Sequence, residues 1–285
     1  MSENKTQVIK DNMNQYISKL CNELRQGHSD LFKSYLKVIS KFHKYSFGNQ
    51  MLIASQMPTA TRVAGFKAWQ KLGRQVKKGE KAIYVLAPSK GKRKVSKSGE
   101  EKEVDCLWFR AVPVFDSSST EGEELPEWCH DLGEDTLNVY NRLKAAMIQR
   151  GISVTECKIS GGALGVSYGG RIEIEESMDP MNKALVLIHE VAHEILHRGS
   201  ENSALSRGFK ECQAEATAYV VAQHFGMDSP FTKDYLLNWG NKEEELKENL
   251  TAVIKASQEI IEILSGEEGI VPEVSVSEDL EQCAA

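Results

Sequence analysis

The segment LVLIHEVAHEILH, residues 185–197, contains the side chains best suited to chemistry. It includes an HExxH pattern, formed by His189, Glu190 and His193, in an apolar run that predicts a helix. The two histidines lie one turn apart on the same helical face, so both imidazoles can bind one tetrahedral metal ion. Glu190 can then accept a proton from a water molecule that the metal activates. The pattern predicts a Zn²⁺ site with a general base, and Mn²⁺ is the alternative ion.

A third protein ligand is expected from the next helix, which contains KECQAEATAYVV at residues 210–221. Glu211 and Glu215 lie one turn apart on this helix and share a face. We expect Glu215 to be the ligand, because it lies within the apolar stripe that would pack against the HExxH helix. Glu211 would then orient a histidine or remain a surface carboxylate. His197 lies about 12 Å of helical rise from the first histidine, so we expect it beside the ligands, with Glu211 and His197 as alternative ligands.

Charge divides the chain into two contrasting halves, although the net charge is only −6. Residues 1–120 contain 22 Lys and Arg but 10 Asp and Glu, whereas residues 121–285 contain 13 and 31. A positive excess attracts polyanions, and an acidic segment repels them. We therefore expect nucleic acid to bind the first half, with a solvated lysine-rich surface as the alternative.

The basic residues of the first half are interleaved with aromatic residues, the combination that single-strand binding requires. Phe66 and Trp69 lie among the expected DNA-binding residues, and Trp108 follows later. A buried core position is the alternative for both tryptophans. The expected DNA contacts are Arg62, Lys67, Trp69, Lys71, Arg74, Lys77, Lys78 and Lys81.

The pattern of apolar residues predicts an α+β fold in each half. In the first half we expect helices near 4–26, 30–43 and 46–57, and strands at 82–87 and 104–115 joined by an exposed loop at 89–102. In the second half we expect helices near 134–150, 180–198, 205–226, 230–240 and 242–265, and strands at 152–157, 163–168 and 171–175.

A stretch rich in Ser, Glu, Gly and Pro separates the halves and predicts a linker. We place a basic DNA-binding domain at 1–118, the linker at 119–132, the metal-binding domain at 133–266 and an acidic, disordered tail at 267–285. The six cysteines form no CxxC pair, so we expect free thiols. Without a signal-peptide pattern or an apolar run of membrane-spanning length, we expect a cytoplasmic protein that does not bind membranes.

Each half of the chain resembles a known family. HExxH followed by ECQAEATAYVVAQHFG resembles the ImmA/IrrE-like metallopeptidases, whose third ligand is a glutamate in an E-A-[NST]-x-[FY] context that Glu215–Tyr219 match. Tyr45–Pro88 and Phe109–Pro126 resemble the ArdC-type antirestriction proteins. This resemblance implies a single-stranded-DNA-binding domain followed by a zincin-like metallopeptidase domain, in a protein of a mobile genetic element. Ser89–Lys102 and the acidic tail depart from the family, so their contacts cannot be transferred.

Three functions remain open from the sequence. The first is a DNA-binding zinc metallopeptidase with antirestriction activity, which hydrolyses a protein or peptide substrate. The second is a non-proteolytic protein that shields DNA or occupies a restriction enzyme and uses its metal for stability. The third is a regulatory metallopeptidase that cleaves a repressor.

Overall fold

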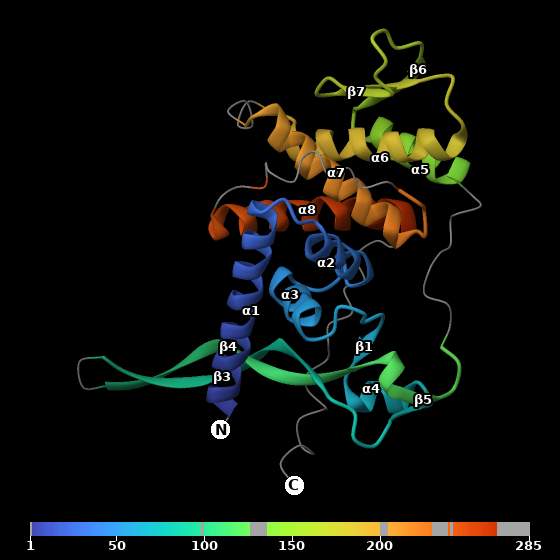
Figure 1. Cartoon of the computed structure of the whole chain (residues 1–285). Helices are drawn as coiled ribbons and strands as arrows, with labels where there is room; N and C mark the ends of the chain where they lie inside the picture. The colour runs from blue at the N-terminus through green and yellow to red at the C-terminus, as the bar shows by residue number, and fades with distance from the viewer. Residues whose placement is uncertain are drawn as a thin grey trace. The chain divides into compact units, whose positions relative to one another are not determined.

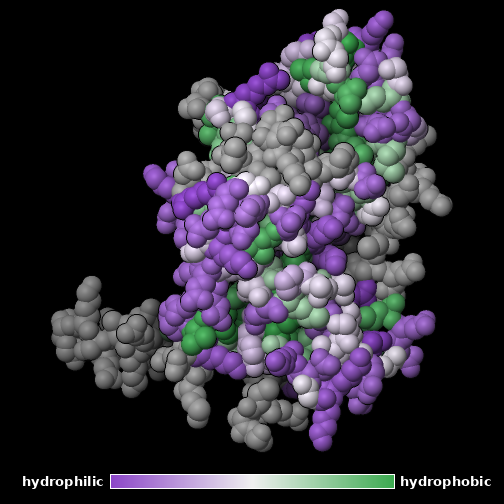
Figure 2. All heavy atoms as spheres, viewed as in Figure 1, coloured by the Kyte–Doolittle hydropathy of each residue, from purple (hydrophilic) through white to green (hydrophobic). Residues whose placement is uncertain are grey.

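The computed structural model describes residues 2–97, 100–125, 136–199, 205–229, 239 and 242–266 of the 285-residue chain. It divides into two compact units. Unit 1 contains Met1–Tyr16 and Gly48–Leu125, and unit 2 contains Ile17–Phe47 and Pro126–Ile270. Helices and small sheets occur in both (Figure 1), which confirms the α+β class. On the face drawn in Figure 2, hydrophobic residues form small patches among hydrophilic ones.

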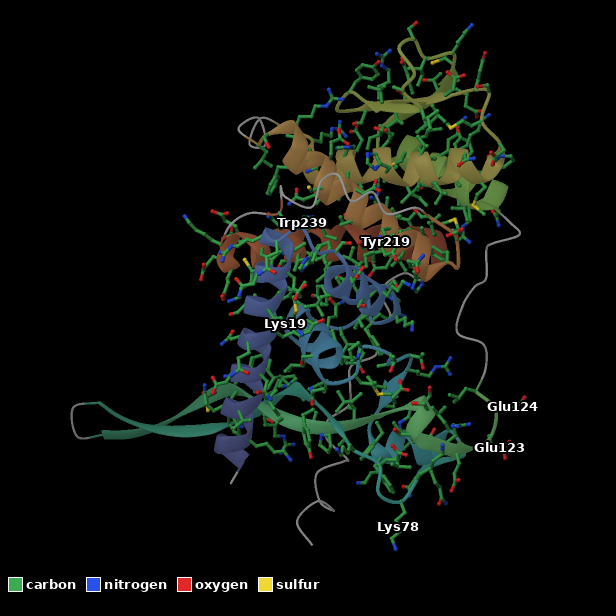
Figure 3. The ribbon with its side chains drawn as sticks, viewed as in Figure 1. Lys19, Lys78, Glu123, Glu124, Tyr219 and Trp239 are labelled. Carbon is green, nitrogen blue, oxygen red and sulfur yellow. The ribbon has the colours of Figure 1, made fainter. Side chains whose placement is uncertain are left out.

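Unit 1 is organised around a long β-hairpin. Its strands β3 (Ile83–Lys97) and β4 (Glu100–Asp116) pair antiparallel, and β4 also pairs with the short β1 (Val63–Ala64). The other elements are the first part of α1 (Ser2–Arg25), α3 (Phe47–Gln56), α4 (Phe66–Lys71), β2 (Arg74–Val76), the 3₁₀ turn η1 (Ser117–Ser119) and β5 (Thr120–Gly122). Lys78, between β2 and β3, extends away from the ribbon (Figure 3).

Helix α3 covers the open edge of β3. The Asn49 side chain donates to the carbonyl oxygen of Leu86 at 2.9 Å and accepts from its amide at 2.8 Å. Gln56 makes the same two bonds with Tyr84, both at 2.9 Å. These amides take the place of a neighbouring strand, so that part of the edge has no unpaired backbone groups to recruit another chain.

A buried carboxylate fixes the end of the hairpin. Asp116 is 2% exposed and accepts from the amides of Thr61 (2.7 Å), Arg62 (3.0 Å) and Ser118 (3.0 Å), and from the Ser118 hydroxyl (2.7 Å). Although burial opposes the charge, these hydrogen bonds lower the pKa of Asp116. The carboxylate therefore joins the segment before β1 to the turn after β4.

Unit 2 packs a small sheet and four helices with α2 (Asp30–Lys41). The sheet order is β6-β8-β7, with β6 parallel and β7 antiparallel to β8. The remaining bounds are α5 (Thr136–Gln149), β6 (Ser153–Cys157), β7 (Gly165–Ser167), β8 (Arg171–Glu175), α6 (Pro180–His197), α7 (Arg207–His224) and α8 (Glu243–Ser265). β7 is thus an edge strand of this sheet.

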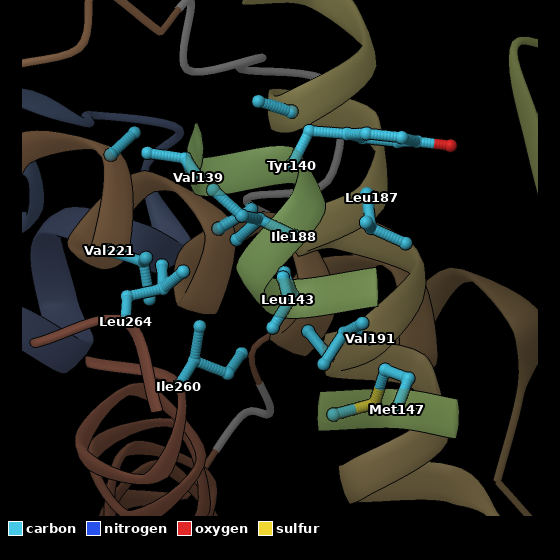
Figure 4. Packing of buried hydrophobic residues seen from close by; sticks show 14 of the residues in the cluster. Val139, Tyr140, Leu143, Met147, Leu187, Ile188, Val191, Val221, Ile260 and Leu264 are labelled. Carbon is cyan, nitrogen blue, oxygen red and sulfur yellow. The ribbon is translucent and has the colours of Figure 1, made fainter. Parts of the chain in front are cut away.

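The core of unit 2 lies between these helices and the sheet. Leu143 of α5, Ile188 of α6, Val221 of α7 and Ile260 of α8 are all fully buried in one cluster (Figure 4). Each such side chain contributes roughly 1.5–3 kcal/mol of transfer free energy. The same packing fixes the faces that α6 and α7 turn toward each other.

Local signals set where the two site helices begin. At α6, Asp179 accepts from the amide of Asn182 at 3.0 Å and Pro180 occupies the first turn, where its missing N–H costs nothing. At α7, Ser206 accepts from the amide of Phe209 at 3.3 Å. Both starts are therefore encoded in the sequence.

The structure differs from the expected organisation in three places. The expected loop at 89–102 is wrong, because β3 and β4 extend through it, and their register places residues of opposite charge, such as Lys94 and Glu103, in facing positions. The expected linker begins too early, since Thr120–Gly122 form β5 and pair with β2. Residues 17–47 group with unit 2, not with the basic N-terminal half. The functional domain limits themselves stay a prediction.

Other expectations concern parts that are only partly described. The expected helix at 230–240 and the tail at 267–285 lie outside the described residues, apart from Trp239. The four cysteines in the described part of the chain are free. No helix among the described residues is long and apolar enough to cross a membrane.

Candidate metal centre

The HExxH segment forms the middle of α6 and lines a cavity of about 930 Å³. The Nε2 atoms of His189 and His193 lie 3.1 Å apart, and their ring centroids are separated by 4.8 Å. The i, i+4 spacing therefore brings both imidazoles to one point, as the sequence predicted.

Glu211 of α7 completes a three-atom donor group. Its Oε2 atom lies 3.4 Å from Nε2 of His189 and 3.4 Å from Nε2 of His193. A tetrahedral ion with bonds of about 2.0–2.1 Å requires donor separations of about 3.3 Å. The three observed separations match the edges of such a tetrahedron, so the donors fit a zinc-like ion and leave coordination positions free.

Glu215, the expected third ligand, also contacts His189 but at the other ring nitrogen. Its Oε2 atom is 3.6 Å from Nδ1 of His189, the nitrogen that faces away from the donor group. Glu211 therefore faces both Nε2 atoms and Glu215 faces Nδ1 of His189, and which of the two carboxylates binds the metal stays a prediction.

His197 contacts the donor group indirectly. Its Nδ1 atom lies 3.1 Å from Nδ1 of His193, and its Nε2 lies 2.9 Å from Oε1 of Gln213. It therefore lies one residue contact away from the Nε2 atoms of the donor group, and its role stays a prediction.

Glu211 and Glu215 affect the protonation of the cluster that they form with His189 and His193. Although burial opposes protonation, hydrogen bonds to Glu211 and Glu215 raise the pKa of His189 to about 9. The same contacts with His189 and His193 lower the pKa of Glu211 well below its usual range. In the absence of a metal the cluster thus holds a proton that metal binding would displace.

Glu190 is buried next to the cluster and 7% exposed. Desolvation raises the pKa of its carboxyl group, despite the neighbouring histidines. Gly165 of β7 lies so close that a Cβ atom there would be 2.8 Å from Oε1 of Glu190 and 2.5 Å from Cγ1 of Val186. Only glycine lets the edge strand approach the carboxyl group this closely.

Two contributors to this site were not predicted from the sequence. One is Gly165, and the other is Glu194, which is 4% exposed. The Glu194 carboxylate accepts from the Ser167 hydroxyl at 2.7 Å and from the amides of Gly169 (2.9 Å) and Gly170 (2.8 Å). It fastens the β7–β8 turn to α6. The available signals were a glutamate directly after the second histidine and a Gly-Gly turn.

The charged residues around the cavity have a clear pattern. Beyond Glu190 and the cluster itself, the described charged residues that line the cavity are Arg198, Arg207 and Lys210. All three are basic, although residues 121–285 contain 13 Lys and Arg against 31 Asp and Glu. The cavity rim thus favours anionic groups.

The structure separates the expected DNA-binding residues into two groups. Trp69 is fully buried and donates from Nε1 to the Phe115 carbonyl at 2.9 Å, so its ring cannot stack on bases. The Arg74 guanidinium donates to Thr120 and the backbone of β5, which makes it a structural residue. The other candidates are exposed or half-buried: Arg62, Lys67, Lys71, Lys77, Lys78 and Lys81.

Two family models match the chain. Residues 4–115 match the N-terminal domain of the anti-restriction factor ArdC, and residues 148–263 match the IrrE N-terminal-like domain of peptidase family M78. The chain has the domain composition of an ArdC-type antirestriction protein. The second match contains the HExxH helix and both glutamates of α7, so it suggests a metallopeptidase domain.

Two solved structures share the fold of this chain. The metal-free crystal structure of antirestriction protein ArdC from the R388 plasmid has a TM-score of 0.57 and 19% identity, covering 89% of this chain and 98% of that chain. The Mn(II)-bound structure has a TM-score of 0.54 and 18% identity, covering 89% and 97%. At these identities the likeness concerns the fold.

An uncharacterized protein of Bacillus anthracis is 27% identical over 271 residues, covering 77% of this chain and 45% of that protein. The ArdC-type chain thus spans less than half of that relative's length.

Proposed function

We propose that this ArdC-type protein is a metal-dependent peptidase whose N-terminal unit binds single-stranded DNA, and that it counteracts restriction. The peptidase half rests on the donor group of His189, His193 and Glu211, with the buried Glu190 beside it. Three protein ligands leave room for water and a substrate carbonyl, as in catalytic zinc sites. The ligand types favour Zn²⁺, and the Mn(II)-bound ArdC structure supports Mn²⁺ as the alternative.

The residues have separate roles in the proposed hydrolysis. The bound metal would polarise the scissile carbonyl and lower the pKa of the attacking water. Glu190 would accept a proton from the attacking water and would deliver it to the departing amine. The desolvation that raises the pKa of Glu190 brings this group closer to neutral pH, where a general base works best. Glu215 holds His189 so that its Nε2 faces the donor group.

The substrate would lie along β7. This edge strand lines the cavity beside Glu190, and its unpaired side can form backbone hydrogen bonds with an extended peptide. The missing side chain at Gly165 leaves the general base accessible to that peptide. A protein or unfolded peptide segment is therefore the proposed substrate class, and a restriction enzyme or a repressor is a candidate source.

The test separates metal binding from chemistry. Glu190→Gln should keep about one metal per chain but lower peptide turnover by roughly 10²–10⁴-fold. Glu211→Gln should lose the metal, whereas Glu215→Gln should weaken metal affinity by about 10–100-fold. Metal analysis and cleavage of a quenched peptide library measure both properties. An active Glu190→Gln variant would refute the peptidase mechanism.

The proposal that unit 1 binds single-stranded DNA rests on exposed aromatic residues in a part of the chain that is rich in Lys and Arg. Phe66 is 47% exposed, Trp108 is 47% exposed and Phe109 is 50% exposed. Stacking on such rings contributes about 1–3 kcal/mol per base, and lysines neutralise the phosphates. Trp108 and Phe109 lie on β4, a different element from the α4 region favoured by the sequence.

Fluorescence titration of labelled single- and double-stranded oligonucleotides at two salt concentrations tests this half. Trp108→Ala should reduce single-strand affinity by about tenfold, whereas Lys255→Ala on α8 serves as the control. Equal binding of both strand types, or no salt dependence, contradicts the proposal.

A DNA-shielding protein with a structural metal is the second candidate, because the basic unit could act without hydrolysis. Glu190→Gln would then retain full antirestriction activity in cells.

A further inference from the structure

A continuous set of buried hydrogen bonds leads away from the donor group. His193 Nδ1 lies 3.1 Å from His197 Nδ1, and His197 Nε2 lies 2.9 Å from Gln213 Oε1. The Gln213 amide nitrogen donates to Asn249 Oδ1 at 3.4 Å, and the Asn249 amide nitrogen donates to the Trp239 carbonyl at 3.2 Å. Gln213 and Asn249 are each 6% exposed. The set thus connects α6, α7 and α8 inside unit 2.

We call this set of hydrogen bonds the relay. Its last bond, to the Trp239 carbonyl, determines which group donates in each of the others. The Trp239 carbonyl can only accept, so the NH₂ group of Asn249 must face it and its oxygen must face Gln213. Gln213 must then donate to Asn249 and turn its own oxygen toward the next ring. A buried unpaired donor or acceptor would cost about 1–3 kcal/mol, so any other orientation of either amide is disfavoured.

The direction continues into the two histidines. Because Gln213 Oε1 accepts, His197 carries its proton on Nε2, and the Nδ1 atom of the neutral ring accepts. His193 must therefore carry its proton on Nδ1, where it donates to His197. Its Nε2 atom then has a free lone pair, which can accept from Nε2 of His189 at 3.1 Å or bind a metal.

We propose that Gln213 and Asn249 are positioning residues that select the metal-binding tautomer of His193 through His197. The inference rests on the proposed metal site, but it concerns a proton position that exists before any metal binds. Without the relay, His197 can donate from Nδ1, and the proton of His193 then moves to Nε2 and blocks that nitrogen. Outer hydrogen bonds of this kind typically change metal affinity by 10–100-fold.

Gln213→Met and Gln213→Glu form the test pair. Methionine has a similar length but cannot accept from His197, whereas glutamate can, although it cannot donate to Asn249. Gln213→Glu should therefore restore the tautomer that Gln213→Met loses, at a cost in stability. Gln223→Met is the matched control, because it makes the same change on the same helix outside the relay. Folding of each variant is compared by thermal unfolding.

Two readouts are required. In the metal-free protein, ¹⁵N–¹H spectra of the histidine rings should show His193 protonated on Nδ1 in the wild type, Gln213→Glu and Gln223→Met, but largely on Nε2 in Gln213→Met. Zinc titration against a chromophoric chelator should give a dissociation constant about 10–100-fold higher for Gln213→Met only. Asn249→Leu, which cannot accept from Gln213, should shift both readouts in the same direction if Gln213→Met does not fold.

The two proposals fail in different ways. A wild-type protein that binds no zinc but shows the Nδ1 tautomer refutes the metallopeptidase and leaves the relay standing. A folded Gln213→Met or Asn249→Leu variant with the wild-type tautomer and wild-type zinc affinity overturns the relay.

Discussion

Removal of the Glu194 carboxylate should loosen the wall of the cavity without touching the metal ligands. Glu194 is 4% exposed, and its two oxygens accept from one hydroxyl and two backbone amides of the β7–β8 turn. Glu194→Ala deletes all these bonds, whereas Glu194→Gln keeps one acceptor oxygen and turns an NH₂ group toward the Gly170 amide, which also donates. The two variants should therefore differ in size of effect.

The magnitude follows from these contacts. Hydrogen bonds to a charged group contribute about 1.5–3 kcal/mol each, and water can replace part of that when the turn opens. For three donors we expect Glu194→Ala to destabilise unit 2 by about 3–5 kcal/mol and Glu194→Gln by about 1–2 kcal/mol. Glu262→Ala, on the exposed face of α8, should stay within about 0.5 kcal/mol of the wild type.

Hydrogen exchange is the suitable assay, because a chain with two units need not unfold in one step. The amides of Gly169 and Gly170 should exchange at least tenfold faster in Glu194→Ala, and urea unfolding of unit 2 should shift by the amounts given above. Peptide turnover should fall while metal content stays near one per chain. Two results would contradict this reasoning. Either both glycine amides keep their wild-type protection in Glu194→Ala, or Glu194→Gln lowers the stability of unit 2 as much as Glu194→Ala does. In both cases the hydrogen bonds of Glu194 would not be what holds the β7–β8 turn.

Three shorter predictions follow from the same structure. Asp116→Asn should lower the free energy of unfolding by about 1–3 kcal/mol at pH 7. Because the pKa of Asp116 is lowered in the folded protein, its contribution to stability is present above the unfolded pKa of about 3.9 and is lost as pH falls through the folded pKa. The urea unfolding curves of the wild type and the variant should therefore converge in acid. Gly165→Ala should reduce peptide turnover at least tenfold with metal retained, because its Cβ would lie 2.8 Å from Glu190 Oε1, and unchanged kinetics would refute the close approach. Lys210→Glu should lower cleavage of acidic peptides relative to basic ones in a library assay, and Lys255→Glu should leave that ratio unchanged.

The N-terminal unit shows which structural features depend on long-range pairing. Helices and apolar strands were recognisable from their periodicity, and α3, β3 and β4 begin close to where we expected them. The loop at 89–102 was mispredicted because a polar, lysine-rich composition also suits a solvated ladder, whose pairing depends on a partner strand. The sequence left a core position open for both Trp69 and Trp108, yet Trp69 is fully buried and Trp108 is 47% exposed. Burial of an aromatic side chain depends on what packs over it, which a local pattern does not contain.

The metal centre separates local from non-local information in the same way. His189 and His193 could be assigned because their approach depends only on the geometry of one helix. Glu211 and Glu215 share a face of α7, and the choice between them depends on which turn of α7 lies opposite the histidines. That register is fixed by core packing between α6 and α7, and a shift of one turn moves a carboxylate by about 5.4 Å. The sequence favoured Glu215 for its place in the apolar stripe, whereas Glu211 has the oxygen nearest both Nε2 atoms, so the choice of third ligand stays a prediction.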